Sequence, residues 1–403
     1  MVEFAGRGGL IHYAFQLCRA LAAAGAEVTL ITDQQYELEG LPHAFRVCKL
    51  LRLWDPKPPG PIATSRAAAA FRSVRRVVRA FRYYREWARL ILHLRRNRPD
   101  VVQLGDIRFP TDLACVFVLR LLGFRLADIC HNVYPFSAGA GLPRASRLTR
   151  FLFAHLYHRF SVVFVHFEVN GRAFREAFGL GPERVAVIPH GNQALFEEMK
   201  EPGLGPDAIR RELRLSTQDR VVLFFGTLSA YKGTALLLHA FARIPPLRSG
   251  PVSLVLAGFP APDFDLAAHE ALALQLGILP RVRFVARYVE SRAVAAWMGL
   301  AAAAVFPYRE VYQSGALHVA QTFGVPIVAT RVGAMEEAVM DGESGLLVPP
   351  DDAAALAAAV SRVLAEPGLA ARLGGRARED AFGRFAWERV AAAILDRYRP
   401  ESP

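Results

Sequence analysis

Short apolar runs alternate with amphipathic, alanine-rich stretches along most of the chain. The runs are continuously apolar, which is typical of strands that are buried on both faces of a parallel sheet. They predict strands at residues 28–32, 101–104, 162–165, 185–188, 221–225, 253–257, 282–284, 303–306 and 327–329. Helical spacing predicts helices between them, most clearly at 12–24, 234–242 and 353–364. A βαβα series of this kind predicts a doubly wound α/β fold.

The length of the chain and a break in the series predict two domains. The chain has 403 residues, and single hydrophobic cores stop growing at about 250–300 residues. The series restarts near 221 after a polar stretch at 197–219, and Gly and Pro accumulate at 189–205. We therefore expect an amino-terminal Rossmann-like domain over 1–190 and a second one over 191–384. A further loop is expected at 55–60, and the first strand looks short because only Val2 to Phe4 precede the glycine turn.

Composition narrows the class of protein. Hydrophobic residues make up 53% and charged residues 21%, as in a well-cored globular protein. The four cysteines form no C-x-x-C pair, which argues against a zinc site and fits a reducing compartment. No secretory signal is visible at the start, and the alanine-rich, uncharged run at 293–308 is shorter than the roughly 18–20 residues of a membrane span. We expect a cytoplasmic protein.

Three segments could bind an anion. Gly6-Arg7-Gly8-Gly9 leads into a helix, whose amino-terminal amides favour phosphate, although an ordinary βα turn fits equally well. Lys232 follows an apolar run and Gly226, where its ammonium could reach a diphosphate; the alternative is a surface lysine. Ser314 and Gly315 are typical of a capped helix start that a ligand can approach closely.

The order of several motifs resembles the family 4 (group 1) retaining glycosyltransferases of the GT-B fold. In the second half they are Lys232-Gly233, Pro-Tyr…Gln-Ser-Gly at 307–315, Gly-x-Pro-x-x-Ala-Thr at 324–330, and Asp-Gly-x-x-Gly-Leu-Leu-Val-Pro at 341–349. The first half adds Gly8-Gly9, Gly-Ala-Glu-Val at 25–28 and Val-Ile-Pro-His-Gly at 187–191. Phe-Ala-Trp-Glu at 385–388 resembles the start of the family's last helix, which returns to the first domain.

This resemblance implies two Rossmann-like domains that face a central cleft, the first binding an acceptor and the second a nucleotide-sugar donor. The last helix, about 385–403, would pack on the first domain. Lys232 would neutralise the donor diphosphate, and His131 would lie beside the donor sugar unless it is a structural histidine at a strand end. The remaining donor-binding residues would be Gly8, Gly9, Gly226, Gln313, Ser314, Gly315 and Ala316.

The chain departs from the family pattern at two places. A basic residue usually precedes the lysine, but Thr227 and Ser229 occupy the candidate positions. The family often carries two glutamates eight residues apart, and here those positions hold Val311 and Val319. Glu310 lies one residue out of register and would be catalytic if the loop shifts. A Gln-Ser-Gly subgroup lacks the glutamate pair, and this chain resembles that subgroup.

Metal ions and membranes are the remaining candidate partners. Asp263-Phe264-Asp265 is a D-x-D triplet, but no second ligand group accompanies it, so we expect no metal and no cofactor.

The stretch 71–98 places apolar residues near one helical face and crowds the rest with arginine. This pattern is typical of a helix on an anionic membrane surface, and also of a surface helix whose arginine stems cover core. Residues 144–159 could extend the basic surface. The apolar positions in question are Phe71, Val74, Val77, Val78, Phe81, Ile91 and Leu94.

Three functions remain open from the sequence. The first is a retaining hexosyltransferase that moves a sugar from a UDP- or GDP-sugar to an acceptor hydroxyl in polysaccharide or glycolipid synthesis, in the cytoplasm or peripherally on the inner face of the membrane. The second is a degenerate, non-catalytic partner subunit with the same fold. The third is a nucleic-acid-binding protein, suggested by the net charge of +12 alone, since no base-reading or base-stacking motif is present.

Overall fold

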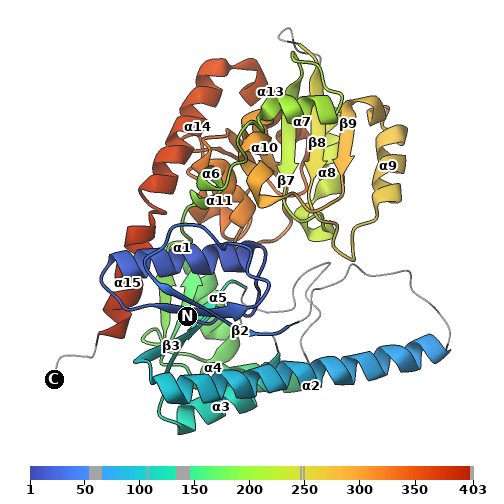
Figure 1. Cartoon of the computed structure of the whole chain (residues 1–403). Helices are drawn as coiled ribbons and strands as arrows, with labels where there is room; N and C mark the ends of the chain where they lie inside the picture. The colour runs from blue at the N-terminus through green and yellow to red at the C-terminus, as the bar shows by residue number, and fades with distance from the viewer. Residues whose placement is uncertain are drawn as a thin grey trace.

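The computed structural model of the chain describes residues 1–53, 66–105, 107, 109–132, 146–245, 247 and 250–399, with side chains in the helix at 66–97 described from residue 77 onward. The chain forms two α/β domains, each built on a parallel sheet (Figure 1). This arrangement agrees with the predicted fold class, two doubly wound Rossmann-like domains. The loop expected at 55–60 lies outside the described residues.

The amino-terminal sheet reverses its strand order at Val2. Val2 makes parallel bridges to both Ile31 and Leu104, and so joins the pair β2-β1 to the set β3-β4-β5-β6. The first strand is therefore a single bridged residue, as short as the sequence predicts. The strands are β1 (Thr29–Asp33), β2 (Arg46–Leu51), β3 (Val101–Leu104), β4 (Arg125–Cys130), β5 (Val162–His166) and β6 (Val185–Ile188). The helices are α1 (Gly9–Ala23), α2 (Arg66–Asn97), α3 (Leu113–Leu121), α4 (Arg147–Tyr157) and α5 (Glu168–Phe178).

The carboxyl-terminal sheet has the order β12-β11-β10-β7-β8-β9, so its order reverses between β7 and β10. Its strands are β7 (Arg220–Phe225), β8 (Val252–Ala257), β9 (Val282–Val285), β10 (Ala301–Phe306), β11 (Ile327–Thr330) and β12 (Leu346–Val348). Its longer helices are α8 (Thr234–Phe241), α9 (Leu266–Gln275), α11 (Gly315–Thr322), α13 (Ala353–Ala365) and α14 (Pro367–Phe382). The shorter ones are α6 (Leu195–Glu198), α7 (Pro206–Glu212), α10 (Val294–Leu300) and α12 (Met335–Ala338).

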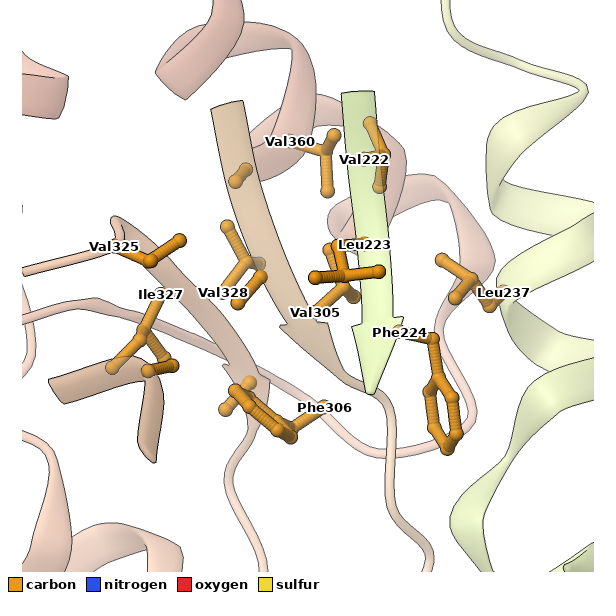
Figure 2. Close-up of a cluster of buried hydrophobic side chains, with 14 of the residues drawn as sticks. Val222, Leu223, Phe224, Leu237, Val305, Phe306, Val325, Ile327, Val328 and Val360 are labelled. Carbon is orange, nitrogen blue, oxygen red and sulfur yellow. The ribbon is translucent and has the colours of Figure 1, made fainter. Parts of the chain in front are cut away.

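The core of this domain explains why the central strands are so apolar. Val222 and Phe224 of β7 and Val305 of β10 are fully buried, with helix residues such as Leu237 packed beside them (Figure 2). Burying each side chain of this size contributes about 1.5–3 kcal/mol. The two central strands are thereby held rigidly, and the loops that follow them start from fixed positions.

The last helix, α15 (Trp387–Tyr398), lies against α1 of the first domain (Figure 1). Trp387 meets the ring of Tyr13 edge-on, with ring centres 5.0 Å apart. Arg125 donates to the backbone carbonyls of Arg397 and Tyr398 at 2.9 and 2.8 Å. Gly191 permits this packing, because a Cβ there would lie 2.5 Å from the Trp387 ring.

All nine predicted strands are present within two residues at either end, but β2, β4 and β12 were missed. β2 is an edge strand that carries Arg46 and Lys49, and charge on an edge strand obscures an apolar run. β4 contains the buried Asp128, and β12 has only three residues. Among the described residues no single helix has the length and apolar composition for crossing a membrane, although α13 and the segment Pro367–Tyr398, at 100° to each other, meet the criteria as a bent pair.

Candidate functional site

The loop after β7 places a buried ammonium group at the edge of the sheet. Lys232 ends a short 3-10 turn and is 9% exposed. Its Nζ lies 5.3 Å from the ring centre of Tyr308 and 5.8 Å from that of Tyr231. No carboxylate of the described part of the chain lies within ion-pairing distance of it. Burial lowers the pKa of Lys232 from 10.5 to about 8, so the unpaired charge is costly until an anion arrives.

The loop after β10 brings a helix start to the same place. Ser314 is the N-cap of α11, and its Oγ accepts from the amide of Leu317 at 3.2 Å. A Cβ on Gly226 would lie 3.3 Å from Cβ of Ala316 and 3.6 Å from Nζ of Lys232, so these three residues share one site. A Cβ on Gly315 would meet nothing within 4 Å. The first amides of α11 therefore point into a site that also holds a cation.

Gly233 holds the two loops together. It has φ of +69°, and a Cβ there would lie 1.8 Å from the carbonyl oxygen of Pro307. Arg309 extends the contact by donating its backbone amide to the carbonyl of Tyr231 at 2.9 Å. Both loops follow the strands between which the sheet order reverses, which is where open α/β sheets bind ligands.

The glycine turn of the first domain also lies where the strand order of its sheet reverses, but one of its amides already has a partner within the protein. Gly8 has φ of +86° and caps α1, and its amide donates to Oε1 of Glu37 at 2.7 Å. Nε2 of His12 lies 2.7 Å from the same oxygen and 3.4 Å from Oγ of Ser291 in the second domain. Burial raises the pKa of Glu37, but the hydrogen bond and charge of His12, the Gly8 amide and Arg7 outweigh it and lower that pKa. A protein carboxylate thus takes the Gly8 amide, while a Cβ on Gly9 would meet nothing within 4 Å.

Four buried histidines meet between the domains. His131, His166 and His190 lie at the ends of β4, β5 and β6, and their ring nitrogens lie within 4.8 Å of one another. Tyr13 contacts all three rings, and His318 of α11 stacks on His190 at 4.3 Å. Burial lowers the pKa of His131 to about 3 and of His190 to about 4, and places those of His166 and His318 well below 6.5. All four are neutral at pH 7, so they offer hydrogen bonds rather than charge.

The sequence motifs indicate only His131 of this cluster as a site residue. The other members were legible as single histidines at strand ends, but nothing local shows that three adjacent parallel strands deliver them to one place. His318 follows Glu310 by eight residues, is 1% exposed and packs between His190 and Phe385.

The remaining predicted site residues differ in burial and in the contacts that they make. Gln313 is half-buried and its side chain interacts with His190, while its buried Oε1 has no hydrogen-bond partner among the described residues. Glu310 is exposed, beside Tyr231. The carboxylates of the D-x-D triplet are engaged within the protein. Asp263 accepts hydrogen bonds from Ser229 Oγ and from the Ala230 amide, at 2.7 and 3.0 Å. Asp265 caps α9.

Hydrogen bonds join the two domains in their contact region, which we call the seam. The carboxylate of Glu337 accepts the backbone amides of Glu168 and Val169 at 2.8 and 2.7 Å. Residues from both domains that include Phe167 and Ser314 pack beside it, and they leave no space large enough for a small-molecule ligand.

Comparisons with known proteins agree with this geometry. Residues 7–192 match the family model described as glycosyltransferase family 4, and residues 219–366 match glycosyl transferases group 1. The D-inositol 3-phosphate glycosyltransferase of Streptomyces bingchenggensis is 36% identical over 229 residues, which cover 55% of this chain and 49% of that protein. The protein of the same name from Acidothermus cellulolyticus is 36% identical over 237 residues, 57% of this chain and 51% of that one. The chain matches about half the length of these curated relatives.

Solved structures share the fold over the whole chain. HepE of Anabaena, solved in complex with UDP and glucose, has a TM-score of 0.72 at 19% identity, covering 98% of this chain and 97% of that one. Sucrose-phosphate synthase of Thermosynechococcus elongatus has a TM-score of 0.70 at 24% identity, covering 99% and 97%. With both halves matched by family models and the two-domain fold in place, the chain belongs to the family 4, group 1 glycosyltransferases of the GT-B fold.

Proposed function

We propose that this protein transfers a hexosyl group from a nucleoside diphosphate sugar, UDP- or GDP-linked, to an acceptor hydroxyl with retention of configuration. The observation that carries the proposal is the unpaired, desolvated ammonium of Lys232 beside the first amides of α11. A diphosphate supplies the missing negative charge. HepE, which shares the fold, was solved with UDP and with UDP-glucose, and this supports a nucleotide-sugar as the donor.

The chemistry follows from where charge develops. Breaking the bond between the sugar and the diphosphate leaves an oxocarbenium-like sugar and a diphosphate that gains negative charge. Lys232 and the amides of Gly315 and Ala316 stabilise that leaving group, and a single donor of this kind is worth about 3–4 kcal/mol of barrier. The neutral ring of His131 contacts sugar hydroxyls. Lys232 supplies the positive charge within the protein, so we expect no metal requirement.

Retention without a carboxylate nucleophile implies that the acceptor attacks from the face the diphosphate leaves. The leaving diphosphate then takes the proton of the acceptor hydroxyl. The Gln-Ser-Gly segment contributes Gln313, whose free Oε1 accepts a hydrogen bond from the donor. Glu310 reaches the donor only if its loop shifts. We place the reaction in polysaccharide or glycolipid synthesis, at the cytoplasmic face of a membrane.

A non-catalytic partner subunit is the second candidate, because Glu37 already occupies the Gly8 amide that a donor phosphate would use. The test is incubation of the purified protein with a panel of UDP- and GDP-sugars, with release of nucleoside diphosphate and thermal stabilisation measured together. Release of UDP or GDP with one donor supports transfer. Stabilisation by a nucleotide with no release from any donor supports the partner subunit. If no nucleotide is released and none stabilises the protein, the proposed nucleotide-sugar site is overturned.

A further inference from the structure

Exposed apolar side chains gather on one part of the molecule. The described residues include fourteen large hydrophobic side chains that are exposed, and ten of them lie between residues 77 and 151. Phe109 lies in the turn before α3, and the other nine are carried by α2, α3 and α4, which lie along the side of the first domain that is remote from the second (Figure 1). Phe81 and Leu121 are each 71% exposed and Leu148 is 65% exposed. Concentration of this kind on one surface marks an interaction site.

The three helices form one continuous surface. The guanidinium of Arg159, just past α4, lies over the ring of Phe117 on α3, 5.3 Å from its centre. Arg98, just past α2, donates to the carbonyl of Leu122 at the end of α3, at 3.2 Å. We call the exposed side of α2, α3 and α4 the three-helix surface.

The apolar positions of α2 divide between two faces, contrary to the single face predicted from the sequence. Tyr83, Trp87, Leu90 and Leu94 are buried and attach the helix to the domain core. Phe81 and Leu92, eleven residues and about three turns apart, share the opposite face and are exposed. Leu94 therefore belongs to the core and not to the exposed face. The core of the domain is formed without Phe81 and Leu92, so the fold of the domain does not explain why these exposed positions are apolar.

The net positive charge of the protein is accounted for by these helices. The sequences of α2, α3 and α4 contain thirteen arginines and one acidic residue, Glu86, a net charge of +12. The whole chain also has a net charge of +12, so the other residues sum to zero. Glu86 is buried and its carboxylate is bonded to Arg85 and Arg89, which leaves no exposed acid on the three helices. The partner of this surface must be anionic.

We propose that the three-helix surface docks on an anionic phospholipid bilayer. Exposed phenylalanine and leucine beside arginine match the interface, where apolar side chains enter the acyl boundary and arginines meet lipid phosphates. A nucleic acid would use the arginines alone and would leave Phe81, Leu121 and Phe151 in water. The docking extends beyond the proposed sugar transfer and does not depend on it, since no residue of the donor site is involved.

The experiment is vesicle flotation of the full chain with phosphatidylcholine vesicles and with vesicles that also contain phosphatidylglycerol. The wild type should float only with the anionic vesicles and should dissociate at high salt. Replacing Phe81, Leu121 and Phe151 together by serine should lower the partition coefficient at least about tenfold. The matched control replaces Phe259, Leu274 and Phe382, exposed side chains outside the surface, and should stay within about twofold of wild type.

Charge reversal provides the second arm. Arg82→Glu with Arg150→Glu should lower binding at least about tenfold, whereas Arg211→Glu with Arg243→Glu, exposed in the second domain, should not. Thermal stabilisation by nucleotide should be equal in all variants, which separates loss of docking from loss of the donor site. Equal flotation of surface and control variants overturns the proposal. So does binding to duplex DNA that survives the serine substitutions while binding to anionic vesicles is absent.

Discussion

Replacing Lys232 by methionine should stabilise the free protein while it disables the site. The ammonium is buried without a carboxylate partner, and its pKa falls from 10.5 to about 8 because burial disfavours the charge. At about 1.4 kcal/mol per pKa unit, that fall corresponds to about 3 kcal/mol of folding free energy. Methionine fills a similar volume without charge, but it forfeits the cation–π contacts with Tyr231 and Tyr308, worth about 0.5–2 kcal/mol. Desolvation wins, and a net gain of about 1–3 kcal/mol is expected.

The pH dependence follows from the sign of this shift. Below the folded-state pKa of about 8 the wild type carries the whole penalty, because both its folded and unfolded states are protonated. Between about 8 and 10.5 the folded state sheds its proton first, and the penalty disappears. The advantage of Lys232→Met should therefore be full at pH 7 and fade as the pH rises to 10.5. Unfolding curves of both proteins at several pH values measure it.

The same substitution should lower turnover at least about a hundredfold and remove stabilisation by UDP or GDP, because a leaving-group donor is lost. Lys200→Met is the matched control, since Lys200 is exposed and should change neither quantity. A variant that is less stable than wild type at pH 7 would contradict the buried-charge argument. A variant with near-normal turnover would contradict the role of Lys232 at the diphosphate.

Three further predictions concern the loops, the seam and metals. Gly233→Ala should lower the free energy of unfolding by about 2–4 kcal/mol, because its Cβ would clash with the neighbouring loop. Gly277→Ala, with the same φ of +69° and no neighbour within 4 Å, should lower it by only about 1 kcal/mol. Chemical unfolding measures both values, and equal losses would show that the clash is not the cause. Glu337→Ala removes two bonds across the seam and should enlarge the radius of gyration in small-angle scattering, while the exposed neighbour variant Glu336→Ala should match wild type. Dialysis against a chelator should leave nucleotide-sugar turnover unchanged, and a tightly held zinc ion lost on His166→Gln would show that the histidine cluster binds metal instead.

The parts of the fold that the sequence predicts are those encoded by neighbours along the chain. A run such as Val221 to Phe225 is apolar because the strand is covered on both faces, and that burial is visible without knowing what covers it. Ser314 caps its helix through an amide three residues away, so the cap is equally local. Lys232 could be selected because a strand, a glycine and a helix start surround it in order. Local order therefore predicted the strands, the capped helix and the loop that carries the ammonium.

The sequence by itself determined the two doubly wound domains and the loops at their points of strand reversal, since period and turn chemistry act over a few residues. Only the tertiary structure decided which distant side chains meet. Glu37 takes the Gly8 amide from a loop beyond the next strand, and His318 joins the histidine cluster from the other domain. Likewise, Leu94 became core and Phe81 became surface because packing, not helical spacing, selects which face of α2 the domain covers. Such contacts depend on how whole elements dock, and no short stretch of sequence carries that information.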